Sequence, residues 1–82
     1  MVNDTTYPIR SLRQAGARLR ARRAEQKVSQ KQLGEMTGTA QSTISDVENG
    51  VVSVSLDVYL RLLEALGAEL SVADRLTDRD PA

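Results

Sequence analysis

Apolar residues between positions 11 and 67 recur three and four residues apart in four short runs. Residues with this spacing share one face of a helix, so each run predicts a helix with one buried stripe. The predicted helices extend from about Ser11 to Gln26, from Ser29 to Thr37, from Ala40 or Gln41 to Glu48, and from Ser55 to Gly67.

The ends of these runs carry residues that favour helix termini. Ser29 is followed three residues later by Gln32, which is the spacing of a capping box. Gly38 can adopt the positive φ that a tight turn after a helix requires. Ser55 can cap the fourth helix, and Asp57 would lie in its positively polarised first turn.

The stripes predict a thin apolar core contributed by all four helices. In the first helix Gly16 is expected to weaken the element slightly, because glycine is a poor helix former. The predicted core residues are Leu12, Ala15 and Leu19, then Leu33, then Ile44 and Val47, and finally Leu56, Tyr59, Leu60, Leu63 and Leu66.

After the fourth helix, "ELSVAD" alternates apolar and polar residues and predicts a short strand with Leu70 and Val72 on one face. A lone strand leaves its backbone groups unpaired. Two copies could pair across a two-fold axis, and the segment around Tyr7 and Ile9 is a competing partner. Leu70, Val72 and Leu66 are the predicted dimerisation residues.

The predicted fold class is therefore all-α: a small helix-turn-helix bundle of four or five helices with a short C-terminal β-strand used for dimerisation. The predicted division is a flexible arm over residues 1–9, the helical domain over 10–67, the dimerising strand over 68–75 and a disordered tail over 76–82.

Composition narrows the possible functions. The chain has 82 residues, no Cys and no His, which removes the usual zinc ligands and acid–base groups. We therefore expect no enzyme activity, no metal and no cofactor. The chain lacks an apolar run of the ~18 residues that a membrane span needs, and its first ten residues do not resemble a signal peptide, so a cytoplasmic protein is expected.

Net charge is zero, but its distribution is uneven. Between Arg10 and Lys31 there are eight basic residues and one acid, whereas between Asp46 and Asp80 there are eight acids and three arginines. Such a charge dipole allows the basic half to face a polyanion. A solvated basic helix is the alternative interpretation.

The third predicted helix has an unusual exposed face. In "GTAQSTISDVENG" only Ala40, Ile44 and Val47 are apolar, and most other residues are short and neutral with amide or hydroxyl groups. Lys, Glu and Ala are better helix formers for a solvated surface. Amides and hydroxyls on a rigid face are suited to the donors and acceptors of DNA base edges.

The segment "SQKQLGEMTGTAQSTISDVENG" resembles the Cro and phage-repressor type of helix-turn-helix protein, and the resemblance extends from about Leu19 to Leu66. It implies that the third helix enters the major groove. The implied function is a sequence-specific double-stranded DNA-binding transcriptional regulator, a repressor.

The resemblance also implies roles for individual residues. Gln30 would support Gln41, which would contact adenine, and Arg23 would form an ion pair with Glu48. The expected base-contacting residues are Gln30, Gln41, Ser42, Ser45 and Asp46. The expected backbone-contacting residues are Lys31, Thr43, Asn49, Arg20 and Lys27.

Four residues depart from that family's usual pattern. Gly34 and Thr37 replace more apolar residues and are expected to loosen the second helix, and Arg22 replaces an apolar residue of the first. Asp46 on the DNA face would repel phosphates unless it accepts from a cytosine amine.

The end of the chain, "LGAELSVAD", more weakly resembles the HipB-like antitoxins. That resemblance implies an antitoxin and autorepressor of a toxin–antitoxin operon, with operator DNA, a second copy of the chain and a HipA-like kinase toxin as partners. A non-catalytic protein-interaction adaptor with the same fold is the alternative, favoured by Asp46 and the zero net charge.

Overall fold

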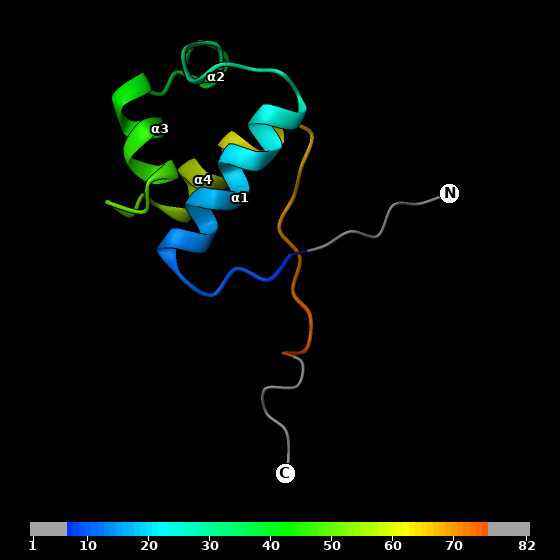
Figure 1. Ribbon diagram of the computed structural model, residues 1–82. Helices are drawn as coiled ribbons and strands as arrows, with labels where there is room; N and C mark the ends of the chain where they lie inside the picture. The colour runs from blue at the N-terminus through cyan, green and yellow to red at the C-terminus, as the bar shows by residue number, and fades with distance from the viewer. Residues whose placement is uncertain (1–6, 76–82) are drawn as a thin grey trace.

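The computed structural model describes residues 7–75, and within that range it contains four α-helices and no strand. They are α1 (Leu12–Glu25), α2 (Gln30–Thr37), α3 (Gln41–Glu48) and α4 (Leu56–Ala65). In Figure 1, α4 lies behind α1, α2 lies above this pair and α3 lies to its left. The predicted all-α helix-turn-helix architecture is confirmed, with helix ends within two residues of those predicted.

The predicted caps form as the sequence indicated. Ser11, at which the first helix was expected to begin, caps α1: its hydroxyl accepts from the backbone N–H of Gln14 at 3.0 Å. At the start of α2 the Gln32 N–H donates to the Ser29 hydroxyl at 2.9 Å, and the Ser29 N–H donates to Gln32 Oε1 at 2.8 Å. Gly38 ends α2 with φ at 70°, a left-handed conformation that side chains disfavour.

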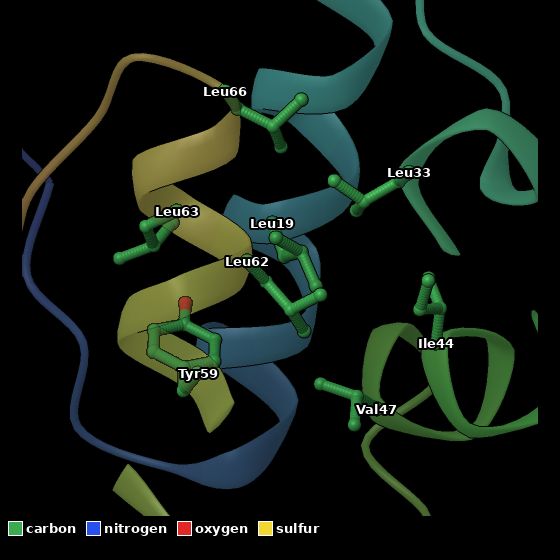
Figure 2. Packing of buried hydrophobic residues seen from close by; sticks show 8 residues of the cluster. All are labelled: Leu19, Leu33, Ile44, Val47, Tyr59, Leu62, Leu63 and Leu66. Atoms are coloured by element: carbon green, nitrogen blue, oxygen red, sulfur yellow. The ribbon is translucent and has the colours of Figure 1, made fainter. Parts of the chain in front are cut away.

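The core lies where the four helices meet, and Figure 2 shows its eight buried side chains. They are Leu19, Leu33, Ile44, Val47, Tyr59, Leu62, Leu63 and Leu66. Leu62 was not among the predicted core residues, and three predicted ones, Leu12, Leu56 and Leu60, are exposed. The buried stripe of α4 follows the spacing 59, 62, 63 and 66, which turns residues 56 and 60 to its edge.

The segment after α4 corrects two predictions. Residues 68–75 form no strand in the single chain, because a strand requires a hydrogen-bonded neighbour and no segment among residues 7–75 supplies one. Val72 is fully exposed and Leu70 is 39% exposed. Leu66 is 2% exposed inside the core, so its side chain is unavailable for contact with a second copy. The tail predicted over residues 76–82 and most of the arm predicted over 1–9 lie outside the described residues.

Two glycines permit close contacts between backbones. A Cβ on Gly16 would collide with the carbonyl oxygen of Val47 and come within 2.7 Å of that of Glu48, so glycine allows α1 to approach α3. A Cβ on Gly34 would lie 2.5 Å from the Thr39 carbonyl oxygen. The sequence indicated only that glycine lowers helix propensity at both positions. The packing shows that glycine is needed there because a Cβ atom would collide with a neighbouring backbone.

Two further departures from the family pattern, Thr37 and Arg22, have hydrogen-bond partners. The Thr37 hydroxyl donates to the Leu33 carbonyl at 2.8 Å and can accept from the Thr39 hydroxyl, which lies 3.0 Å away. Arg22 donates from Nε to the Leu66 carbonyl at 2.9 Å and from Nη2 to the Gly67 carbonyl at 3.0 Å. The Arg22 side chain therefore satisfies carbonyl groups just beyond α4 that the helix itself leaves unpaired.

Candidate nucleic-acid interface

The outer face of α3 consists of polar side chains. Ile44 and Val47 are buried, whereas Gln41, Ser42 and Asp46 are exposed on the helix. Asn49 caps its C-terminal end and is also exposed. Two further residues with predicted DNA contacts, Thr43 and Ser45, are half-buried. The helix therefore presents amide, hydroxyl and carboxylate groups from a backbone held by its apolar stripe.

The first turn of α3 lacks a side-chain cap. Its N-cap residue is Ala40, whose backbone is extended and whose methyl group cannot accept a hydrogen bond. The Ala40 carbonyl accepts from the N–H groups of Thr43 and Ile44, at 3.0 and 3.1 Å. The N–H groups that precede them point out of the helix end, where the helix dipole favours an anion.

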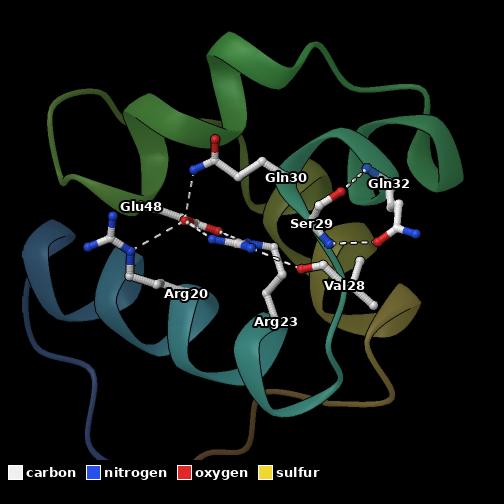
Figure 3. A network of polar contacts seen from close by, with 7 residues as sticks. All are labelled: Arg20, Arg23, Val28, Ser29, Gln30, Gln32 and Glu48. Atoms are coloured by element: carbon white, nitrogen blue, oxygen red, sulfur yellow. Dashed lines mark hydrogen bonds and ion pairs between the residues drawn. The ribbon is translucent and has the colours of Figure 1, made fainter.

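The opposite end of α3 is anchored by a buried carboxylate. The Glu48 side chain has no exposed surface, and Arg23 donates to it twice, from Nε to Oε2 at 2.6 Å and from Nη2 to Oε1 at 2.9 Å. Gln30 Nε2 donates to Oε1 at 3.0 Å, and Arg20 Nε lies 3.7 Å from the same oxygen. We refer to Glu48, Arg20, Arg23 and Gln30 as the Glu48 cluster (Figure 3).

The contacts of the Glu48 cluster shift the pKa values of Glu48 and Arg23. Burial raises the pKa of Glu48, but the hydrogen bonds from Arg23 and Gln30 and the positive charges of Arg23 and Arg20 outweigh it, so the pKa lies below its ordinary value. The hydrogen bond to Glu48 raises the pKa of Arg23. The carboxylate is therefore ionised at neutral pH and joins α1, α2 and the end of α3.

Positive charge remains exposed around this cluster. One carboxylate faces two arginines, and the Arg20 side chain is 60% exposed. Lys31 is exposed in the first turn of α2, and Lys27 is exposed in the turn before it, with a positive φ of 59°. These three cations belong to α1, α2 and the turn that joins them.

Gln30 differs from the expectation drawn from phage repressors. Its amide nitrogen donates to Glu48, and no hydrogen bond joins it to Gln41 among the described residues. The sequence analysis did not connect Gln30 with Glu48. A signal was available, because Glu48 follows Ile44 and Val47 at the spacing of buried residues.

Among residues 7–75 there is no group of three or more carboxylate, His or Cys side chains that could hold a metal ion. Within the same residues, no helix is long and apolar enough to cross a membrane.

The family described as Helix-turn-helix matches residues 19–72 of this sequence. The chain belongs to this family. The matched segment begins within α1 and includes all of α2, α3 and α4, so it contains the whole Glu48 cluster and the exposed face of α3.

Several known proteins are similar to this helix-turn-helix protein. "Putative antitoxin HigA2" of Mycobacterium tuberculosis (strain ATCC 25618 / H37Rv) is 37% identical over 62 residues, which are 74% of this chain and 61% of HigA2. The chain thus spans less than two thirds of the length of that relative.

Solved structures share the fold. The restriction-modification controller protein C.AhdI from Aeromonas hydrophila is 38% identical with a TM-score of 0.68, over 71% of this chain and 88% of C.AhdI. Chains of the HipB–O4 20mer complex and of the HipA–HipB–O2–O3 complex are 25% identical with TM-scores of 0.75. Each of these matches covers 84% of this helix-turn-helix protein and 97% of the other chain.

Proposed function

We propose that this helix-turn-helix protein is a sequence-specific double-stranded DNA-binding transcriptional regulator that acts as a repressor. The observation that carries the proposal is the exposed polar face of α3, whose far end is anchored by the buried Glu48 carboxylate. In this interpretation α3 enters the major groove, where Gln41 and Ser42 contact base edges. Ser45, Asp46 and Gln30 would contribute to the same readout.

Electrostatics support the same orientation. Arg20, Lys27 and Lys31 would contact phosphates on either side of the groove, together with Thr43 and Asn49. The N–H groups at the start of α3 are available to another phosphate oxygen. Asp46 is the one carboxylate on this face, and it would be tolerated opposite a cytosine, whose N4 amine donates to a carboxylate.

We infer that the regulator is an antitoxin that represses its own toxin–antitoxin operon. The similarity to HigA2, which is named as an antitoxin, and to HipB, which forms a complex with HipA, supports this role. A HipA-like kinase toxin is the protein partner that the second similarity suggests. A regulator of this kind would act in the cytoplasm.

We also propose that the active form is a homodimer held by residues 69–74. Leu70 and Val72 expose apolar surface there, and the last described backbone hydrogen bond before this segment is donated by Ala68 to Leu63. Pairing of two such segments across a two-fold axis would satisfy their backbone groups and bury both side chains twice. It would also provide two recognition helices for half-sites about 34 Å apart.

The DNA-binding proposal is tested by selecting sites from a random double-stranded library with the full chain. We expect one enriched motif, bound about 10³-fold more tightly than random DNA of equal length. The Gln41→Ala variant serves as the matched control and should enrich a less restricted motif. Selection that enriches no motif would contradict the proposal and favour a protein-interaction adaptor.

The antitoxin role needs a separate test. The reading frame adjacent to this gene would be expressed alone and together with this chain, and growth would be measured. We expect the neighbour alone to arrest growth and co-expression to restore it. Arrest that persists while the chain still represses its own promoter would refute the antitoxin role and leave the DNA-binding proposal intact.

A further inference from the structure

The Glu48 carboxylate determines which end of the Gln30 side-chain amide faces it. An ionised carboxylate has acceptor oxygens and no proton to donate. Its pKa lies below its ordinary value, although burial alone would raise it, so Glu48 is ionised at neutral pH. The group that faces it from Gln30 must therefore be the amide NH₂, which donates to Oε1 at 3.0 Å.

The orientation of the Gln30 amide follows from this contact. Turning the amide over would bring its oxygen against the carboxylate oxygen, so that two acceptors would face each other without a proton. Figure 3 shows the amide nitrogen directed at Glu48 and the amide oxygen on the other side. No group among residues 7–75 donates to that oxygen.

Gln30 is well placed to use this free oxygen. It is the first residue of α2, it is half-buried, and α2 packs against α3. Arg23, which also binds Glu48, donates a third hydrogen bond to the Val28 carbonyl at 2.9 Å and so fixes the segment that leads into α2. Both the backbone before Gln30 and the end of its side chain are therefore held in one geometry.

We propose that Glu48 fixes Gln30 as a hydrogen-bond acceptor toward DNA, so that at one position of its site the protein selects a base with an exocyclic amine. This inference rests on the proposed function. Adenine and cytosine carry such an amine in the major groove, whereas thymine and guanine present a carbonyl oxygen there. Glu48 acts as a positioning residue, because it touches no DNA and works through Gln30.

The fixed orientation of its amide distinguishes Gln30 from Gln41, the glutamine that is exposed on α3. Gln41 is exposed, and its side chain has no hydrogen-bond partner among the described residues, so its amide can turn to donate or to accept. It can form the two-point contact with adenine that uses both atoms of the amide. The amide nitrogen of Gln30 is already bonded to Glu48, so only the amide oxygen is available to DNA. This oxygen can distinguish an amine from a carbonyl group, but it cannot form a two-point contact.

The amide orientation is tested in the free full-length chain by nuclear magnetic resonance. We expect the side-chain NH₂ of Gln30 to exchange with solvent about tenfold more slowly than that of the exposed Gln26, because one hydrogen bond protects it. Coupling across the hydrogen bond to the Glu48 carboxylate should identify the partner. Equal exchange rates for the two residues would overturn the inference.

The specificity is tested on the selected site with single-base variants. Wild-type protein should prefer adenine or cytosine over thymine or guanine at one position by about fivefold or more. Gln30→Met, which keeps the side-chain length and removes the amide, should abolish that preference and leave the others. Gln26→Met is the matched control and should change no preference. A uniform effect of Gln30→Met on all sites, or none, would overturn the inference.

A double variant tests the role of Glu48 itself. Arg23→Met with Glu48→Gln removes both charges and provides an amide that can either donate to Gln30 or accept from it. Provided that circular dichroism shows a folded protein, the preference for an amine should fall toward unity although Gln30 is retained. Retention of the full preference would show that Glu48 does not position Gln30. If the double variant does not fold, the Gln30→Met comparison and the exchange rates decide.

The outcomes separate this inference from the function on which it rests. If wild-type protein selects no DNA site, the proposed function fails and the inference fails with it. If it selects a site but Gln30→Met leaves every base preference unchanged, only the inference fails.

Discussion

Arg23 and Glu48 form a two-point contact, 2.6 Å from Nε to Oε2 and 2.9 Å from Nη2 to Oε1, that joins the last turn of α1 to the last residue of α3. The planar guanidinium matches the two carboxylate oxygens, and this geometry fixes direction as well as distance. The orientation of α3 is therefore determined at its C-terminal end by α1, and along its length by Ile44 and Val47 in the core.

Breaking this contact should destabilise the fold. We expect Glu48→Gln to lower the free energy of unfolding by about 3–5 kcal/mol, because it leaves the Arg23 charge without its buried partner. Urea denaturation followed by circular dichroism provides the measurement. The matched control is Asp57→Asn in the exposed Asp57–Arg61 pair, which should cost less than about 1 kcal/mol. Equal losses for the two variants would contradict a structural role of the Glu48 cluster.

The same contact should be sensitive to acid. The folded-state pKa of Glu48 lies below its ordinary value of 4.5, so its contribution is fully present above pH 4.5 and is lost as the pH falls through the lowered pKa. The difference in unfolding free energy between wild type and Glu48→Gln should be constant from pH 7 to 5 and shrink below pH 4.5. Comparing the two proteins cancels the titration of the other carboxylates. A difference that grows on acidification would refute the assignment.

At Gly16 the close approach of α1 to α3 should outweigh the lower helix propensity of glycine. Alanine is a better helix former than glycine by about 1 kcal/mol, so Gly16→Ala would stabilise an isolated α1. In the folded protein the added methyl group meets the carbonyl oxygens of Val47 and Glu48, and we expect a loss of about 1–3 kcal/mol. Thermal unfolding measures the change. A Gly16→Ala variant as stable as wild type would mean that α1 and α3 can separate freely.

The sequence predicted features that depend on residues close together along the chain, and it missed features that depend on packing between helices. Caps at Ser29 and Ser55 could be predicted because the side chain and the N–H that it binds lie three residues apart. The apolar spacing of α4 was ambiguous between two overlapping stripes, so Leu62 was missed and Leu60 was wrongly assigned to the core. Packing within the core shared by the four helices selects one of these stripes.

The candidate site was predictable to the extent that residue type indicates chemistry. The exposed polar face of α3 followed from the scarcity of apolar residues between Ala40 and Gly50. The spacing of Ile44, Val47 and Glu48 was a signal that Glu48 is buried, but it did not identify Gln30 as a partner, because that contact joins residues 18 positions apart on different helices. Pairing of residues 69–74 with a second copy stays a prediction, since one chain cannot form that ladder.

Base contacts and phosphate contacts should separate in binding experiments. We expect Gln41→Ala to weaken binding to the selected site by about 1–3 kcal/mol and to relax preference at one base pair. Lys31→Ala should weaken all sequences alike and reduce the slope of log K against log salt by about 1. Fluorescence anisotropy over a range of salt concentrations gives both quantities. Gln41→Ala binding every site as tightly as wild type would contradict the major-groove assignment.

The proposed dimer can be tested against the other exposed apolar surface. Val72→Pro removes a backbone donor and disturbs the extended segment, so it should yield monomers that bind the selected site weakly. Leu56→Ser, at a residue that is 63% exposed on α4, should leave the dimer intact. Sedimentation at micromolar concentration measures both. The reverse result, with monomers for Leu56→Ser alone, would assign the interface to α4.

The contact of Arg22 with the end of α4 also determines where attached groups leave the molecule. By binding the Leu66 and Gly67 carbonyls, Arg22 directs the chain along the side of α1 and α4 that faces away from α3, as Figures 1 and 2 both show. A fluorophore or an affinity tag attached at the end of the described segment, at residue 75, would therefore be tethered on the side opposite α3. Labels for single-molecule work can be attached there without entering the groove that α3 is proposed to occupy.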